Sequence, residues 1–444
     1  MPISWTSEQV IAQAPDESSV KAGRGLASPA KWVSSGYDDR AVWGECKGSG
    51  KLPYQVSIEL AEPAFKCSCP SRKFPCKHGL GLFLLYAAAQ LKEGSAPDFC
   101  AEWLAKRSAT EERKNEKAAA ETTPEEDAKR EKARLKRVAD REAKVAAGLA
   151  ELELWLGDLV RQGLATAQNQ PTEYWEKTAK RLIDAQSPNA ARLVRNLSSL
   201  VYRKDKYGER LAGKLLEQIG RLYLVCESWR RLAELPEAVR ADVKTAVGFT
   251  VKEDELTAAE TIEDVWQVHG IRVYEEEKLR VQRIWLAGET SGRRALVLNF
   301  AFRNQPLDVG FTAGTRIRAA LAFYPGNFPQ RAFVKERFEA ANLDALAAFD
   351  DFDALLGDYA AALAKNVWLE TFPAMIRRAV PVRRGAAWFL RDETGKLLPL
   401  EADEAALWKL DAVCGDRPTA IFSEWDGETL RPLTVWSDGK PIRL

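Results

Sequence analysis

The sequence has almost no net charge. Its 65 Lys and Arg residues balance 64 Asp and Glu residues, which leaves a formal charge of +1. A protein with this balance has no overall field that attracts polyanions, so a nucleic-acid role would need a local basic patch. Hydrophobic residues make up 46% of the chain and charged residues 29%, as in soluble globular proteins. A chain of 444 residues predicts about two to four domains.

Export and membrane signals are also missing. The first residues, MPISWTSEQVIAQAPDESS, lack the basic segment followed by an apolar segment that marks a signal peptide. No uncharged apolar run reaches the ~18 residues needed to span a membrane, and the best candidate, 79–91, fits a core helix better. The seven cysteines are odd in number and unevenly spaced, which favours reduced thiols. We therefore expect a cytoplasmic protein with no membrane contact.

Motifs of the common enzyme classes are absent as well. The chain contains no G-x-x-x-x-G-K-[ST], G-x-S-x-G, H-E-x-x-H or G-x-G-x-x-G. Of its two histidines, His269 lies in a strand-like segment, DVWQVHGIRVY, where a structural role is the more common one. The acidic stretch FDDFDALLGDY fits the exposed face of a helix. Cys226 and Cys414 lie in apolar contexts that favour buried thiols. We assign no catalytic residue and expect that the protein is not an enzyme.

One short segment concentrates the metal-binding side chains. FKCSCPSRKFPCKHGLGLFLLY, residues 65–86, contains Cys67, Cys69, Cys76 and His78. Three thiolates and one imidazole form a complete tetrahedral ligand set for Zn²⁺. Because the protein fills all four positions, none is left for a catalytic water. We predict one structural zinc ion, whose binding energy helps to fold a small domain.

Other chemistries fit this segment less well. A redox pair is usually Cys-x-x-Cys beside a βαβ pattern, and that context is missing. A Cys–His hydrolase needs a histidine placed apart from its nucleophile, whereas His78 follows Cys76 by two residues. Cys46 and Cys100 could in principle join the metal site, but neither is needed. We expect Cys46 to pack near the zinc.

The segment is also basic. It has no acidic residue between Lys66 and His78, and its basic residues are Lys66, Arg72, Lys73 and Lys77. Arg40, Lys47 and Lys51 lie nearby in the sequence, and two phenylalanines are interleaved with the lysines. A basic loop with aromatic residues suits phosphate contact and base stacking. The same cations could instead favour the thiolate forms of the ligands and remain solvated. Both interpretations stay open at this point.

The chain predicts an α+β multidomain protein with a small N-terminal ββα zinc domain, a central helical bundle and a C-terminal α+β domain with a mainly antiparallel sheet. In the zinc domain we expect a hairpin with strands 41–46 and 54–60, because apolar and polar residues alternate in the second strand. The expected regions are an irregular N-terminal arm (1–30), the zinc domain (31–104), a charged linker followed by a solvent-facing helix (105–148), a helical region (149–256) and the α+β domain (257–444).

The pattern Cys-x-Cys, then Cys-x-His, between a hairpin and an apolar helix resembles the SWIM-type zinc finger. Residues 31–90 also resemble bacterial SWIM proteins of similar length. The ligand positions of that family correspond here to Cys67, Cys69, Cys76 and His78. The resemblance implies a zinc-dependent module that binds DNA or protein. It also implies a protein partner, a MoxR-type AAA+ ATPase or a von Willebrand factor A-domain protein. We therefore expect an adaptor or protein-interaction role, with direct DNA binding through the basic loop as the alternative.

Overall fold

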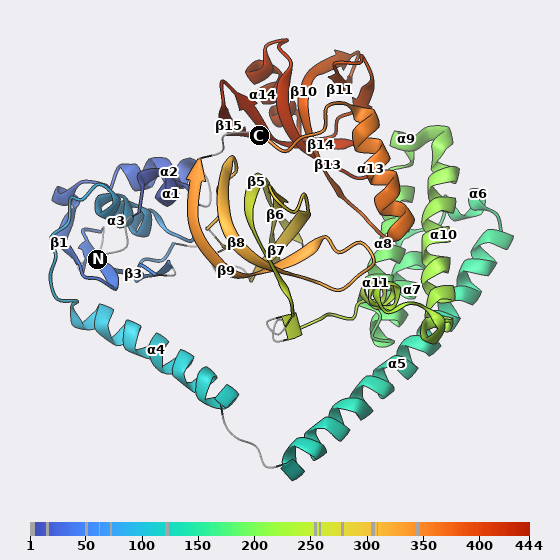
Figure 1. Cartoon of the computed structure of the whole chain (residues 1–444), viewed down its shortest axis with the longest axis horizontal. Helices are drawn as coiled ribbons and strands as arrows, with labels where there is room; N and C mark the ends of the chain where they lie inside the picture. Colours follow the sequence, from blue (N-terminus) through green and yellow to red (C-terminus); the bar gives the residue numbers. More distant parts are fainter. Residues whose placement is uncertain are drawn as a thin grey trace. The chain divides into compact units, whose positions relative to one another are not determined.

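The computed structural model describes residues 5–14, 17–48, 52–61, 63–71, 73–119, 124–252, 255–256, 259–276, 279–302, 307–308, 310–342 and 346–444 (Figure 1). The chain divides into two compact units. One contains Met1–Glu121, Ile271–Ile284 and Leu298–Thr315, and the other contains Thr122–Gly270, Trp285–Val297 and Arg316–Leu444. No helix in the described part of the chain is long and apolar enough to cross a membrane.

The N-terminal domain is an antiparallel sheet with a helix packed on it. Its strands follow the order β1-β2-β3-β4, with bounds β1 Trp32–Tyr37, β2 Ala41–Cys46, β3 Tyr54–Glu59 and β4 Ala64–Cys67. The predicted hairpin is confirmed as β2 and β3, and β1 and β4 extend it on either side. Helix α3 (Lys77–Ala87) contacts β2, β3 and β4. Val56 and Ile58 of β3 are fully buried in the core that the sheet shares with α3.

The expectation of an irregular arm at residues 1–30 is wrong. This segment forms the helices α1 (Ser7–Ala12) and α2 (Glu17–Arg24) and a 3-10 turn at Pro29–Lys31. The physical reason is that every residue of α3 from His78 to Leu85 is buried, so the side turned away from the sheet must also be covered. Both N-terminal helices contact α3, and Val10 of α1 is fully buried in the same core.

The charged region 105–148 is helical over more of its length than expected. Helix α4 (Asp98–Ala119) runs through the part predicted to be a linker, and α5 (Pro124–Arg161) contains the predicted solvent-facing helix. Alanine, glutamate, lysine and arginine dominate the segment and are all strong helix formers, so a sequence with few apolar residues still forms helix. The side chains at 132–139 are exposed, as expected for a solvent-facing helix.

The central region is a helical bundle, as predicted. Its helices after α5 are α6 Leu164–Ala167, α7 Thr172–Asp184, α8 Pro188–Tyr202, α9 Lys204–Tyr207, α10 Leu211–Arg230 and α11 Glu237–Val247. Apolar residues at spacings of three and four fill one continuous core between them. Trp175 of α7 is 1% exposed and is among the largest side chains in that core.

The C-terminal region contains two separate sheets. The first is a closed barrel in the order β5-β6-β7-β9-β8, with bounds β5 Thr261–Glu276, β6 Leu279–Gly288, β7 Arg294–Phe302, β8 Thr315–Phe323 and β9 Arg331–Asn342. The second follows the order β12-β11-β10-β13-β14-β15, with bounds β10 Phe372–Arg384, β11 Ala387–Asp392, β12 Leu397–Pro399, β13 Thr419–Trp425, β14 Leu430–Ser437 and β15 Lys440–Arg443.

Two helices accompany these sheets, α13 (Phe352–Lys365) and α14 (Glu404–Cys414). The predicted α+β class is confirmed. The described strand pairs of this region are antiparallel, except for β7 with β9 and two isolated bridges. The closure of one sheet into a barrel was not predicted. Trp266 is fully buried there and donates its indole N–H to the Ala319 carbonyl at 3.0 Å.

Candidate metal centre

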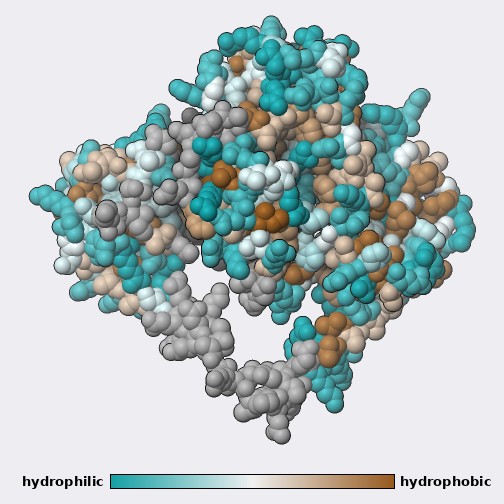
Figure 2. Space-filling view, viewed as in Figure 1, coloured by the Kyte–Doolittle hydropathy of each residue, from teal (hydrophilic) through white to brown (hydrophobic). Residues whose placement is uncertain are grey.

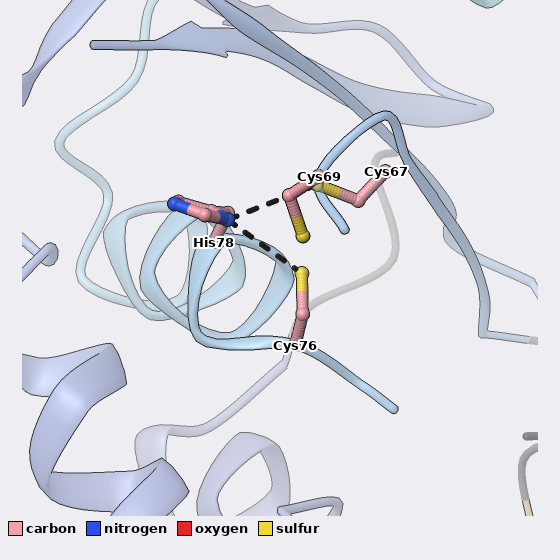
Figure 3. A group of neighbouring side chains, drawn as sticks. All are labelled: Cys67, Cys69, Cys76 and His78. Atoms are coloured by element: carbon pink, nitrogen blue, oxygen red, sulfur yellow. Dashed lines mark hydrogen bonds between the residues drawn. The ribbon is translucent and has the colours of Figure 1, made fainter. Parts of the chain in front are cut away.

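Four side chains from two adjoining elements converge on one point. Cys67 ends β4, Cys69 follows it in the loop, Cys76 is the residue before α3, and His78 lies in the first turn of that helix. The three sulfur atoms and one ring nitrogen of His78 all lie within 4.8 Å of one another. The Nδ1 atom of His78 is 3.9 Å from the Sγ atoms of both Cys67 and Cys76 (Figure 3).

This arrangement fits a tetrahedral zinc ion. Zinc–sulfur bonds of about 2.3 Å and zinc–nitrogen bonds of about 2.0 Å place the ligand atoms roughly 3.5–3.8 Å apart. Two of the observed separations are 3.9 Å, close to these values, and the others are at most 4.8 Å. The protein supplies all four donors, so the predicted single structural zinc at Cys67, Cys69, Cys76 and His78 agrees with the geometry.

Cys76 links the metal site to the helix. Its sulfur accepts a hydrogen bond from the Gly79 N–H at 3.5 Å, which makes it the N-cap of α3. The thiol of Cys67 donates a hydrogen bond that lowers the pKa of Cys76 to about 4, and the same bond raises the pKa of Cys67. A thiolate at this position also interacts favourably with the positive end of the helix dipole. The negative charge of the ligand set is therefore placed where the helix stabilises it.

Aromatic side chains enclose the histidine side of the centre. His78 is 6% exposed, and its ring lies 4.9 Å from the ring of Tyr54. Phe65 packs edge-on against Phe74 at 6.1 Å and Phe83 at 5.7 Å. Gly79 permits this packing, since a Cβ atom there would lie 3.0 Å from the Phe65 ring. These rings pack around the metal loop and the first turn of α3.

The structure separates the basic residues of this region into distinct groups. Lys73 and Lys77 are exposed and line a single pocket together with Lys47. Lys66 is exposed on the opposite face of β4, because successive strand residues alternate and Phe65 points to α3. The charge of Lys66 acts instead on Cys100, a residue of α4. The predicted basic group is therefore split, and Arg72 and Lys51 lie outside the described residues.

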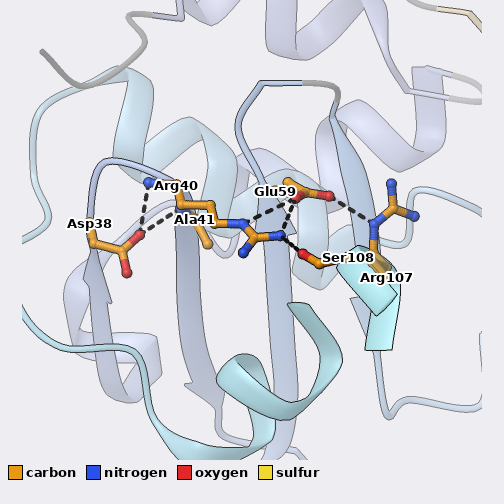
Figure 4. A network of polar contacts seen from close by, with 6 residues as sticks. All are labelled: Asp38, Arg40, Ala41, Glu59, Arg107 and Ser108. Atoms are coloured by element: carbon orange, nitrogen blue, oxygen red, sulfur yellow. Dashed lines mark hydrogen bonds and ion pairs between the residues drawn. The ribbon is translucent and has the colours of Figure 1, made fainter. Parts of the chain in front are cut away.

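Arg40 belongs to a structural ion-pair network on the sheet. Its guanidinium contacts Glu59 Oε1 at 3.2 Å and the Ser108 hydroxyl at 2.7 Å (Figure 4). Arg107 contacts the other oxygen of Glu59 at 2.8 Å. These bonds connect β3 with α4. Arg40 is therefore engaged in holding this helix to the sheet.

The remaining cysteines stay apart from the centre. Cys46 is fully buried near the ligands, as expected, and its sulfur contacts the carbonyls of Lys31 at 3.8 Å and Lys47 at 3.7 Å. Cys100, Cys226 and Cys414 are buried thiols. Among the described residues, the only group of three or more His, Cys, Asp and Glu side chains able to share a metal ion is the one formed by the four ligands.

The other residues considered for chemistry have structural roles. His269 is buried, its Nε2 lies 3.2 Å from the Gln267 side-chain oxygen, and burial lowers its pKa to about 3. In the acidic stretch, Asp351 caps α13 by accepting from the Ala354 N–H, and Asp350 pairs with Arg377 at 2.8 Å. These contacts agree with the predicted buried histidine and exposed acidic helix face.

Two family models match the chain. The SWIM zinc finger matches residues 54–87, which run from the start of β3 to the end of α3 and include all four ligands. The SWIM-associated four-helix bundle domain matches residues 140–247, within the central helices. Comparisons with curated proteins and with solved structures gave no match. The chain therefore contains a SWIM zinc finger in its N-terminal domain and the SWIM-associated four-helix bundle domain in its centre.

Proposed function

We propose that this protein is an adaptor, in which the zinc finger folds the N-terminal domain and the helical bundle docks a partner protein. The closed set of four protein ligands supports the structural role of zinc, because no position remains for a reacting molecule. A metal that only holds structure leaves binding, rather than catalysis, as the role of the domain it supports.

The outward face of α10 is the observation that supports docking. Leu216, Tyr223 and Leu224 are 53%, 44% and 43% exposed. Gly213 and Gly220 lie on the same face, where an added Cβ atom would meet nothing within 4 Å. These five positions are spaced as one side of a helix, and apolar residues that share an exposed face favour protein association. Figure 2 shows hydrophobic side chains at the surface over the helical region.

The partner is proposed from the family resemblance. Bacterial SWIM proteins are associated with MoxR-type AAA+ ATPases and von Willebrand factor A-domain proteins, so we propose a partner of one of these two kinds. Together with the apolar face of α10, this gives a defined hypothesis: the partner covers Leu216 and Tyr223 in the complex.

The test measures binding of the purified zinc-loaded chain to a MoxR-type ATPase and to a von Willebrand factor A-domain protein of the same organism, by calorimetry. Leu216→Asp should weaken binding at least tenfold, because it places a charge in an apolar contact. Leu135→Asp is the matched control, since Leu135 of α5 is exposed to a similar extent, 57%. The docking proposal would be rejected if neither protein bound, or if Leu216→Asp and Leu135→Asp lost the same amount of affinity.

Direct DNA binding is the second candidate, because Lys73 and Lys77 are exposed beside the zinc centre. Binding through phosphate contacts weakens steeply as salt rises, and each lost contact makes that dependence shallower. Lys73→Ala and Lys77→Ala should therefore reduce the salt dependence of affinity for a DNA duplex. Absence of binding at low salt would exclude this candidate.

A further inference from the structure

A pocket opens beside the zinc centre, within the N-terminal domain. Its volume is about 500 Å³, which lies in the range of sites for small organic ligands. It is lined by α2 and the residue Leu26 after it, by the two residues that follow β2, by the start of β3, by the metal loop and by the first turn of α3. Two of the zinc ligands, Cys69 and His78, form part of its wall. The pocket is therefore built on the metal site.

Its charge is strongly positive. Lys47, Lys73 and Lys77 come from three different segments and all line the pocket. The Lys73 ammonium donates to the Ser18 hydroxyl at 2.8 Å, which holds it over the start of α2. None of the described residues that line the pocket carries a carboxylate. Zinc with three thiolates and a neutral histidine carries one negative charge, so three lysines exceed what the metal centre balances.

The rest of the wall is apolar and aromatic. Ala22 of α2 and Leu26, which follows that helix, line the pocket together with Pro70 of the metal loop. Tyr54 also lines it and is fixed by its contact with the ring of His78. An inorganic anion would need only the lysines. The apolar wall offers a surface for the ring of a larger ligand, on which an aromatic base can stack.

We propose that this pocket binds a small phosphorylated ligand of the nucleoside phosphate class. The phosphates lie among Lys47, Lys73 and Lys77, where ammonium groups and serine hydroxyls donate to their oxygens. The base lies against the side chains of Tyr54, Ala22 and Leu26. This site is independent of the proposed docking surface on α10. It also differs from the proposed DNA-binding surface, which uses Lys73 and Lys77 but does not need Lys47.

The test uses the full-length zinc-loaded protein and calorimetry with ADP and UDP as probes. We expect one site, with Lys47→Ala weakening affinity about tenfold, the effect of losing one charge-assisted contact. Lys47 lies outside the ligand loop, so zinc content should stay at one equivalent. Lys66→Ala is the matched control, because it removes the same charge from the opposite face of the sheet. The Lys66→Ala protein should bind ADP and UDP with the same affinity as the wild-type protein.

Comparison ligands separate the proposal from its alternatives. Adenosine and inorganic phosphate should each bind at least tenfold more weakly than ADP, because each occupies only one half of the pocket. Phosphate binding as tightly as ADP would reduce the site to a simple anion site and overturn the proposal. The proposal would also be overturned if a 20-mer single-stranded DNA bound more tightly than ADP and lost affinity equally in Lys47→Ala and Lys66→Ala. Failure of both ADP and UDP to bind at millimolar concentration would overturn it as well.

Discussion

Cys76 and His78 are joined by the first turn of α3, with the Sγ atom of Cys76 3.9 Å from the Nδ1 atom of His78. Cys76 serves at the same time as the N-cap of that helix. The residue that starts the helix is therefore also a ligand of the metal site. Binding of zinc fixes the first turn of the helix whose apolar side chains form the core of the domain.

Removal of a zinc ligand should release the metal and loosen the N-terminal domain. We expect the wild-type protein to retain one equivalent of Zn²⁺, and Cys67→Ser and His78→Ala to lose it. The reason is that three remaining donors bind zinc much more weakly and leave the domain without its central crosslink. Metal analysis after dialysis, with hydrogen exchange of residues 54–87, measures both effects.

Cys46→Ala is the control for this experiment. Cys46 is fully buried near the site but hydrogen-bonds to backbone carbonyls instead of joining the ligand group. Zinc content should therefore remain at one equivalent. Full occupancy in both ligand variants, or loss of metal in Cys46→Ala, would show that the ligands are assigned wrongly.

Replacement of two glycines by alanine should change the free energy of unfolding in opposite directions. Gly81 of α3 lies against α2, and a Cβ atom there would come within 2.7 Å of Leu26 Cβ. Gly81→Ala should destabilise the domain by about 1–3 kcal/mol, since overpacking separates the helices. Gly220→Ala in α10 should stabilise by about 1 kcal/mol, because nothing lies within 4 Å and alanine favours helix.

Urea unfolding of both variants measures this difference. Because the two glycines lie in different units of the chain, hydrogen exchange should assign each change to its own region. A stabilised Gly81→Ala protein would contradict the close contact of α2 with α3.

The sequence was sufficient to predict those parts of the structure that depend on residues close together in the chain. Zinc ligands within twelve residues give the metal site from spacing alone, and the alternation in 54–60 gives the hairpin strand. The helices at residues 7–24 were missed, although Thr6 and Gln9 form a capping box that signals a helix start. Their short length and polar composition masked the few apolar residues that cover α3.

Features that depend on distant contacts could not be predicted. Barrel closure joins β5 with β8, whose paired residues are 49 to 61 positions apart, and no local pattern encodes that pairing. In the same way Lys47 meets Lys73 and Lys77 only after the sheet forms. The separation of Lys66 from these lysines follows from strand alternation, which is evident once β4 is known to be a strand.

Asp242 should make the stability of its unit depend on pH. It is 8% exposed on α11, accepts from the Asn327 N–H at 2.9 Å and the Asn366 amide at 3.1 Å, and burial raises its pKa to about 6. The folded state binds the proton of the Asp242 carboxyl more tightly than the unfolded state does. Protonated Asp242 therefore adds about 2–3 kcal/mol to the free energy of unfolding below pH ~4, and this contribution is lost as pH rises through about 6. Asp242→Asn keeps an acceptor oxygen but cannot ionise, so urea unfolding between pH 4 and 7 should show a greater gain over wild type at pH 7 than at pH 4. An unchanged difference between the two proteins across that range would show that Asp242 titrates in the folded state as it does in water.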